Sequence, residues 1–361
     1  MPPILDVRDL HVHFHTLDGV VNAVNGVSFT LEEGETLAIV GESGSGKSVT
    51  VMSLLGLIPV PPGKVTGGSA LYYGANGERD LLKMSELELK YLRGEAVKPD
   101  EEFTEMDLLQ MSREELRNIR GGQIGFVFQD PISSLNPILP IGEQVSEILT
   151  RHKGLPKEEA LERAIRLLGH VGIPDPELRV KNYPFEFSGG MRQRVVIAIA
   201  IACTPKIVIA DEPTTALDVT VQAQIVDLFK QLRQDLDVSI IWITHDLGVV
   251  AGIADRVLVM YGGRPVEVAL VDDLYDNPRH PYTTGLLCAL PRLDSVASDR
   301  LECIPGAPPD MLQPLVHCPF AWRCDYAFER CWEKIPPLIS VGEKHKVACF
   351  YDLEKAGPRD V

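Results

Sequence analysis

The sequence predicts an α/β fold followed by a small, loop-rich C-terminal domain. First, a short apolar segment at 36–40 runs into a Gly-rich loop and then an apolar helix. Second, two more apolar segments, "KIVIADE" and "IIWITHD", read as buried strands that end in charged residues. Third, prolines and cysteines become frequent toward the C-terminus. We therefore expect a main domain at 1–265 and a separate domain at 266–361.

Composition excludes several classes of protein. The 361 residues carry 35 Lys and Arg against 51 Asp and Glu, a net charge of −16, which disfavours a nucleic-acid-binding surface. The longest candidate membrane segment, "VVIAIAIAC" at 195–203, is too short to span a bilayer. The N-terminus lacks a basic region followed by an apolar one, so we expect a cytoplasmic protein. In that compartment clustered cysteines indicate a metal more often than disulfides.

The first element is a strand at 36–40 that leads into "GESGSGKS" and then the apolar helix "VTVMSLLGLI". This is the G-x-x-x-x-G-K-S motif in the strand–loop–helix context that it requires. Its glycines allow backbone N–H groups to surround phosphate oxygens. Lys47 would reach the β- and γ-phosphates, and Ser48 would bind Mg²⁺. The predicted nucleotide-binding residues here are Gly41, Ser43, Gly44, Ser45, Gly46, Lys47, Ser48 and Val49.

The second strand, in "KIVIADEPTTALD", ends in two carboxylates. Asp211 can hold Mg²⁺ directly or through water, and Glu212 follows where a carboxylate can polarise the attacking water. The sequence thus indicates nucleotide hydrolysis as well as nucleotide binding.

"FSGGMRQR", at 187–194, closely resembles the signature sequence of ATP-binding-cassette ATPases. The other family motifs follow the family order: Gln129 in "IGFVFQD" as the Q-loop glutamine, Asp218 in "TALD" as the D-loop, and His245 as the switch histidine. Phe14 stands where the family places an aromatic side chain that stacks on adenine. The resemblance covers about residues 5–270.

The resemblance implies a RecA-like core with an antiparallel β subdomain and a helical subdomain at about 130–195. It implies ATP and Mg²⁺ as cofactors, with Ser48, Gln129 and Asp211 at the metal. The implied catalytic residues are Lys47, Gln129, Glu212 and His245.

In this family the signature sequence acts on ATP bound to a second cassette. The sequence contains one P-loop motif and one signature, so we expect a second subunit, identical or homologous. A homologous partner is the more typical arrangement in the part of the family that the C-terminal segments resemble, as described below. Ser188 and Gly190 are expected to contact the partner's γ-phosphate, and Gly189 and Asp218 are also predicted to bind nucleotide.

One stretch departs from the family pattern. The segments 80–94 and 107–121 match at nine of fifteen positions when shifted by 27 residues. Each contains Ser-x-x-Glu, a capping box, and ends in glycine. We interpret 80–121 as a duplicated insertion of two short helices that is tolerated at the surface, with an extra contact to a partner as the alternative.

The segments "HPYT", at 280–283, and "IPGAPPDMLQP", at 304–314, resemble the C-terminal region of ATPase subunits of dipeptide and oligopeptide importers. The resemblance implies a motor subunit at the cytoplasmic face of the membrane. Its partners would be two integral membrane permeases and an extracytoplasmic peptide-binding protein, with no nucleic acid. Two alternatives stay open: a soluble ATPase of the same superfamily, and an importer of nickel or another small solute.

Four cysteines lie near the C-terminus: Cys318, Cys324, Cys331 and Cys349. Structural zinc usually uses a close C-x₂₋₄-C pair, and every gap here is wider, which fits a larger cluster. The spacing also resembles the tail of peptide-importer ATPases, where such cysteines hold a [4Fe–4S] cluster. Zinc is the alternative, with His317 and His345 near enough to compete as ligands.

Overall fold

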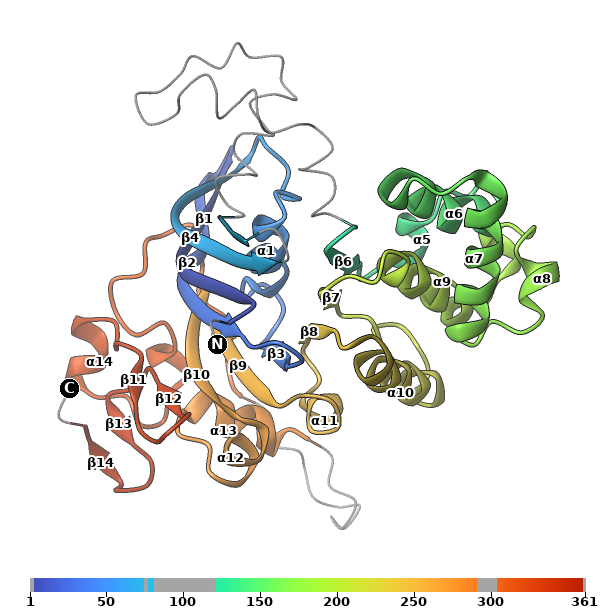
Figure 1. The fold of residues 1–361 in the computed structure, drawn as a ribbon. Helices are drawn as coiled ribbons and strands as arrows, with labels where there is room; N and C mark the ends of the chain where they lie inside the picture. Colours follow the sequence, from blue (N-terminus) through green and yellow to red (C-terminus); the bar gives the residue numbers. More distant parts are fainter. Residues whose placement is uncertain (1–2, 75–76, 81–120, 291–303, 360–361) are drawn as a thin grey trace.

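The computed structural model describes residues 3–74, 77–80, 121–290 and 304–359. Figure 1 shows two bodies: sheets and short helices that include both ends of the described chain, and a group of helices set to one side. The duplicated insertion predicted at 80–121 lies almost wholly outside the described residues. Within the described ranges, no helix is long and apolar enough to cross a membrane.

The larger sheet has eight strands in the order β11-β12-β10-β9-β3-β8-β7-β6. Strands β6, β7, β8, β3 and β9 run parallel to one another, and β10 pairs with β9 in the antiparallel direction. Every residue of β3, β7 and β8 is buried, as expected for parallel strands covered on both faces. The three predicted strands are therefore confirmed. The bounds are β3 Thr36–Val40, β6 Ile124–Val127, β7 Ile207–Asp211, β8 Ser239–Thr244, β9 Arg256–Tyr261 and β10 Arg264–Leu270.

The smaller sheet is antiparallel and has the order β2-β1-β4-β5. It packs on the larger sheet through one apolar cluster that includes Leu10 of β1, Leu37 of β3 and Leu54 of helix α1. The expected antiparallel β part is thus present. Its strands are β1 Leu5–Thr16, β2 Gly19–Leu31, β4 Gly63–Gly74 and β5 Gly77–Asp80, and α1 is Lys47–Leu54.

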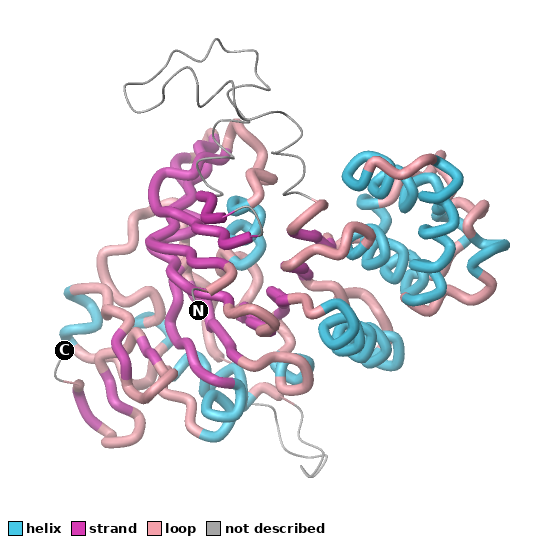
Figure 2. Tube along the Cα trace, viewed as in Figure 1, coloured by secondary structure: helices cyan, strands magenta, loops and turns pink. Residues whose placement is uncertain are grey.

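The helices set to one side lie between β6 and β7 in the chain, and Figure 2 shows that no strand joins them. In α7 the residues Ala160, Ala164 and Leu168 are buried at a spacing of four, so one helix face packs inward. Helix α10 packs beside β7 and β8 through a second apolar cluster. The bounds are α5 Pro131–Ser134, α6 Ile141–Lys153, α7 Lys157–His170, α8 Pro176–Arg179, η1 Pro184–Glu186, α9 Gly189–Ile201 and α10 Val219–Leu236.

The C-terminal region consists of short elements joined by loops, and it is attached to the larger sheet. Strand β12 pairs with β10, where Glu267 lies opposite Val347. Tyr261 of β9 shares an apolar cluster with Tyr282 and Phe320. The tail therefore packs on the sheet that carries the P-loop. Helix α11, Leu247–Val250, lies between β8 and β9. The elements of the C-terminal region are α12 Val271–Asp276, α13 Pro281–Cys288, η2 Ala321–Arg323, α14 Glu329–Glu333, β11 Ile339–Ser340, β12 Lys346–Val347, β13 Tyr351–Asp352 and β14 Gly357–Pro358.

Candidate active site

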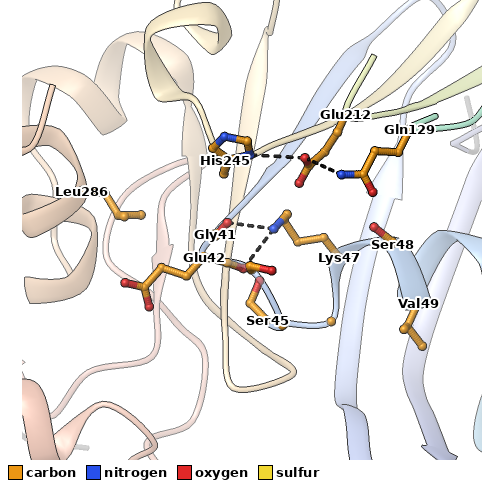
Figure 3. A pocket seen from close by; sticks show the side chains of 13 residues that line it. Gly41, Glu42, Ser45, Lys47, Ser48, Val49, Gln129, Glu212, His245 and Leu286 are labelled. Carbon is orange, nitrogen blue, oxygen red and sulfur yellow. Dashed lines mark hydrogen bonds and ion pairs between the residues drawn. The ribbon is translucent and has the colours of Figure 1, made fainter. Parts of the chain in front are cut away.

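A cavity of about 600 Å³ opens where β3, β7 and β8 end, and Figure 3 shows it from close by. Residues that follow the carboxyl ends of parallel strands meet at one edge of a sheet, which is where ligands bind in such folds. Here the edge carries the Gly-rich loop after β3, the carboxylates at the end of β7 and the imidazole after β8. The lining residues are Gly41, Glu42, Ser43, Gly44, Ser45, Gly46, Lys47, Ser48, Val49, Gln129, Glu212, His245 and Leu286.

The loop after β3 packs closely against its surroundings. Gly41 has φ 155° and Gly46 has φ 93°, in the range that side chains rarely adopt. A Cβ atom on Gly41 would lie 2.3 Å from the Met260 carbonyl oxygen, and one on Gly46 would lie 2.4 Å from the Ala23 carbonyl oxygen. Glycine is required at both positions because β9 and β2 leave no room for a side chain.

Lys47 is the buried cation of the cavity. Its Nζ donates to the carbonyl oxygens of Gly41 at 2.8 Å and Glu42 at 3.0 Å. Burial lowers the pKa of Lys47, and the charges of Glu212, Asp211 and Glu42 act in the opposite direction. An ammonium group held only by neutral carbonyls can exchange them for phosphate oxygens, which are stronger acceptors.

Ser48 and Asp211 form a pair of oxygen donors. The Ser48 hydroxyl donates to Asp211 Oδ1 at 2.8 Å, and the Asp211 side chain is buried. Burial raises the pKa of Asp211, while the hydrogen bond from Ser48 opposes that shift. A hydroxyl and a carboxylate beside a phosphate-binding loop are the ligand types that Mg²⁺ takes, so these residues fit the metal.

The Glu212 carboxylate contacts side chains from three segments of the chain. Its Oε2 accepts from Gln129 Nε2 at 3.1 Å and from the Thr215 hydroxyl at 2.9 Å, and it lies 3.3 Å from His245 Nδ1. The residue has φ 47°, an uncommon left-handed conformation of the kind that concentrates at functional sites. The carboxylate is held by donors, and it can accept a hydrogen bond from a water beside the phosphates.

Six predicted cofactor-binding residues do not line the cavity of this chain. One of them, Asp211, lies behind the lining residue Ser48 and accepts its hydrogen bond. Phe14 lies half-buried on β1 against the apolar core. The Ser188 hydroxyl accepts from the Met191 N–H at 3.3 Å and begins α9, with Gly189 and Gly190 in its first turn. The Asp218 carboxylate accepts from the Val221 N–H at 3.0 Å and begins α10. Their action on a second chain's nucleotide stays a prediction.

The sequence reasoning missed two lining residues, Glu42 and Leu286. Glu42 occupies a position that the P-loop motif leaves free, so the motif carries no signal for it. Leu286 lies on α13 in the C-terminal region, and only tertiary packing brings it to the cavity.

The four C-terminal cysteines are unpaired thiols, and three of them are buried. The Cys318 N–H donates to the Cys331 carbonyl oxygen at 3.0 Å. Burial raises the pKa of Cys318 and of Cys349 to about 12 and that of Cys324 to about 11, and neighbouring thiolates add to each shift. The thiols are therefore near one another.

No group of three or more His, Cys, Asp or Glu side chains within the described ranges is arranged to hold a metal ion. Both histidines considered as zinc ligands have other partners. His345 Nε2 lies 2.7 Å from Glu267 Oε1, and the His317 ring packs against Trp332. The predicted metal cluster thus has no support from the arrangement of these side chains.

Two regions of the chain match known protein families. Residues 24–215 match "ABC transporter", and residues 266–331 match "Oligopeptide/dipeptide transporter, C-terminal region". The chain is 49% identical to the oligopeptide transport ATP-binding protein OppD of Bacillus subtilis, over 95% of this chain and 87% of the relative. It is 47% identical to the dipeptide transport ATP-binding protein DppD of the same organism, over 99% of this chain and 97% of the relative.

Solved structures show the same fold. A dimeric, post-hydrolysis structure of the ATP-binding cassette MJ0796 bound to ADP and Pi superimposes with a TM-score of 0.58 at 26% identity. The match covers 74% of this chain and 98% of that one. The cbiO1 protein of Clostridium perfringens, part of an ABC transporter complex, matches with a TM-score of 0.57 at 27% identity, over 77% of this chain and 92% of that one.

Proposed function

Because the chain belongs to the ABC transporter family, we propose that it is the ATP-hydrolysing motor subunit of a membrane importer for di- and oligopeptides. The observation that carries the proposal is the combination of one cavity holding the P-loop and Glu212 with a C-terminal region of the oligopeptide/dipeptide transporter type. Relatives named for oligopeptide and dipeptide transport cover 95% or more of the chain, which favours peptides over nickel as the cargo.

In the proposed mechanism the ATP polyphosphate lies along the loop 41–48. Lys47 leaves the carbonyl oxygens of Gly41 and Glu42 and binds phosphate oxygens. Ser48 and Asp211 would hold Mg²⁺, which neutralises charge on the β- and γ-phosphates when bound.

Glu212 accepts a hydrogen bond from the attacking water and takes up its proton as the oxygen bonds to the γ-phosphorus. The bond from the γ-phosphorus to the β–γ bridging oxygen breaks in the same step, and ADP leaves with that oxygen. Gln129 and His245 hold the carboxylate from either side, so that it stays directed toward the cavity. These contacts orient the base before the nucleotide arrives, which lowers the cost of ordering it during the reaction.

Hydrolysis also requires a second cassette in our proposal. Ser188, Gly189, Gly190 and Asp218 lie at the starts of α9 and α10 and do not line this chain's own cavity. Helix N-termini carry partial positive charge and suit a partner's phosphates. We propose a homologous chain as the partner, and the dimeric state of the MJ0796 cassette supports paired cassettes.

The remaining partners in the proposal are two integral membrane permeases and, through them, an extracytoplasmic peptide-binding protein. The chain would be held at the cytoplasmic face of the membrane by these permeases. The test is purification of the intact complex from gently solubilised membranes. Recovery with permeases, and ATP hydrolysis that rises with peptide-loaded binding protein, supports the proposal. Recovery as an active ATPase that never associates with membrane subunits would favour the soluble alternative.

We also propose that Cys318, Cys324, Cys331 and Cys349 hold a [4Fe–4S] cluster. Four free thiols lie in one part of the tail, and Cys318, Cys324 and Cys331 share one apolar cluster. They supply the thiolate set that such a cluster takes. The side chains would have to turn toward a common centre to do so, since no such group exists within the described ranges. The role proposed for the cluster is structural or regulatory, because ATP hydrolysis needs no electron transfer.

A further inference from the structure

Residues of the C-terminal region hold the P-loop from outside the cavity at Glu42. All three kinds of polar group on this residue have partners. Its N–H donates to the Tyr282 hydroxyl at 2.9 Å, and its carbonyl oxygen accepts from Lys47 at 3.0 Å. Its carboxylate accepts two hydrogen bonds from Arg323, at 2.6 Å from Nη1 and 2.9 Å from Nη2. Two of these three contacts come from the C-terminal region.

Every N–H group of the buried Arg323 guanidinium has a hydrogen-bond acceptor. The side chain is 5% exposed, and its Nε donates to the Pro305 carbonyl oxygen at 2.8 Å. Besides Glu42, Nη1 donates to the Tyr261 hydroxyl at 3.1 Å and Nη2 to the Ile304 carbonyl oxygen at 3.3 Å. The guanidinium has five N–H donors, and these five contacts use each of them. Its orientation toward the P-loop is therefore determined by the tail itself.

Three aromatic rings support this arrangement. Tyr261 at the end of β9 packs against Tyr282 with ring centroids 4.6 Å apart and against Phe320 at 5.2 Å. Tyr282 and Phe320 are 5.4 Å apart. The two tyrosine hydroxyls that touch Glu42 and Arg323 thus come from a packed cluster, and both tyrosines are almost wholly buried.

The pairing of Glu42 with Arg323 affects the charge that a nucleotide in the cavity would meet. Glu42 lines the cavity, and in Figure 3 its side chain extends toward the side on which Leu286 lies. A carboxylate beside a polyphosphate repels it, and the repulsion is strong because the surroundings are partly desolvated. A bidentate guanidinium removes that charge and also fixes the backbone of the loop.

We propose that Arg323 is a positioning residue for ATP binding, which neutralises the Glu42 carboxylate and, with Tyr282, holds the start of the P-loop in its binding conformation. The C-terminal region is then part of the nucleotide site rather than an appendage of it. The inference rests on the proposed function only in taking the cavity as the ATP site.

The test uses the full chain and MgATP as the probe. Arg323→Ala leaves Glu42 unpaired, so we expect the Kd for MgATP to rise about tenfold, which corresponds to about 1.4 kcal/mol. Arg323→Lys keeps the charge but not the fork, and we expect an intermediate Kd. In the double variant Arg323→Ala, Glu42→Gln the repelling charge is gone, and the Kd is expected to return to within about threefold of the original.

Arg359→Ala is the matched control. Arg359 also has a buried side chain in this region, but its partners are Asp352 at 3.3 Å and the Tyr351 carbonyl oxygen at 3.0 Å, neither of which belongs to the P-loop. It is expected to lower thermal stability without changing the Kd. Unchanged MgATP binding in Arg323→Ala overturns the inference. The inference is also overturned if Arg323→Ala weakens MgATP binding and the added Glu42→Gln substitution does not restore it. Removing a charge would not repair a loss of structure.

Lys47→Ala distinguishes a failure of the proposed function from a failure of the inference about Arg323. If that variant binds MgATP normally, the cavity is not the ATP site, and the proposed function fails together with the inference. If Lys47→Ala loses binding while Arg323→Ala does not, only the inference fails.

Discussion

The nucleotide cavity and the four-cysteine segment differ in how their chemical groups are held. In the cavity, Glu212 and Lys47 come from different strand ends, and each has specific partners at hydrogen-bonding distance. In the cysteine segment the thiols are neighbours, but within the described ranges they do not form a group that could hold an ion. A parallel sheet places side chains before any ligand binds, whereas short loops depend on the ligand to order them.

The largest effect that separates the two regions is expected from Glu212→Gln. The variant keeps the contacts of the P-loop but removes the carboxylate that activates water. We expect kcat for ATP hydrolysis to fall by about 10²- to 10⁴-fold, with MgATP binding unchanged. Phosphate release and equilibrium binding are measured on the same preparation. Hydrolysis at the original rate would show that another group is the base.

The second effect concerns the metal content of the tail. Anaerobically purified protein is expected to carry about four irons per chain, and Cys324→Ser to lose them, since each iron takes one thiolate. Cys203→Ser is the control, because Cys203 is buried just after α9, with its Sγ 3.9 Å from the Ile148 carbonyl oxygen of α6, and lies outside the tail. Iron and zinc are counted together. A colourless protein with one zinc per chain would replace the cluster by the zinc alternative.

The third effect is weaker binding in Lys47→Ala. The variant deletes the buried ammonium that the carbonyl oxygens of Gly41 and Glu42 hold, so the phosphates lose a charge-assisted hydrogen bond. We expect the Kd for MgATP to rise about a hundredfold, the equivalent of about 3 kcal/mol. Titration with MgATP measures it. An equal loss of binding in Glu212→Gln would mean that the two residues do not have separate roles.

The smallest effect is a dependence of stability on pH at the junction between sheet and tail. His280 is fully buried, and burial lowers its pKa to about 4, with the charge of Glu267 acting in the opposite direction. The unfolded chain, with the ordinary pKa of 6.5, binds the proton first as pH falls, so stability is present near pH 7 and is lost toward pH 4. The His280 Nδ1 accepts from the Tyr282 N–H at 3.0 Å, a contact that protonation would break.

We expect the free energy of unfolding to fall by about 2 kcal/mol between pH 7 and pH 5 through His280 alone. Chemical denaturation at both pH values measures the change, and His280→Asn, which keeps a capping side chain without a titrating imidazole, is the control. The same pH dependence in wild type and in His280→Asn would assign the loss to other groups.

The antiparallel sheet was implied only by the family resemblance. The P-loop and the strand ends at Asp211 and His245 could be predicted from the residues themselves. Each depends on local features: a buried apolar run, glycines that a tight loop requires, and a motif that fits only a strand–loop–helix unit. The predicted strands form because the folded sheet buries the apolar residues of these segments.

Other features were decided by the tertiary structure alone. No local pattern links Glu42 to Arg323, which is 281 residues away in the chain, or brings Leu286 to the cavity. The buried Glu267 accepts from the His280 N–H at 3.0 Å and lies 2.7 Å from His345 Nε2, which joins strand β10 to the tail. Such contacts depend on how the tail docks on the sheet, and docking is set by shape and burial over the whole interface. The motif residues specify the chemistry of the nucleotide loop, whereas tertiary packing selects the distant residues that hold that loop in place.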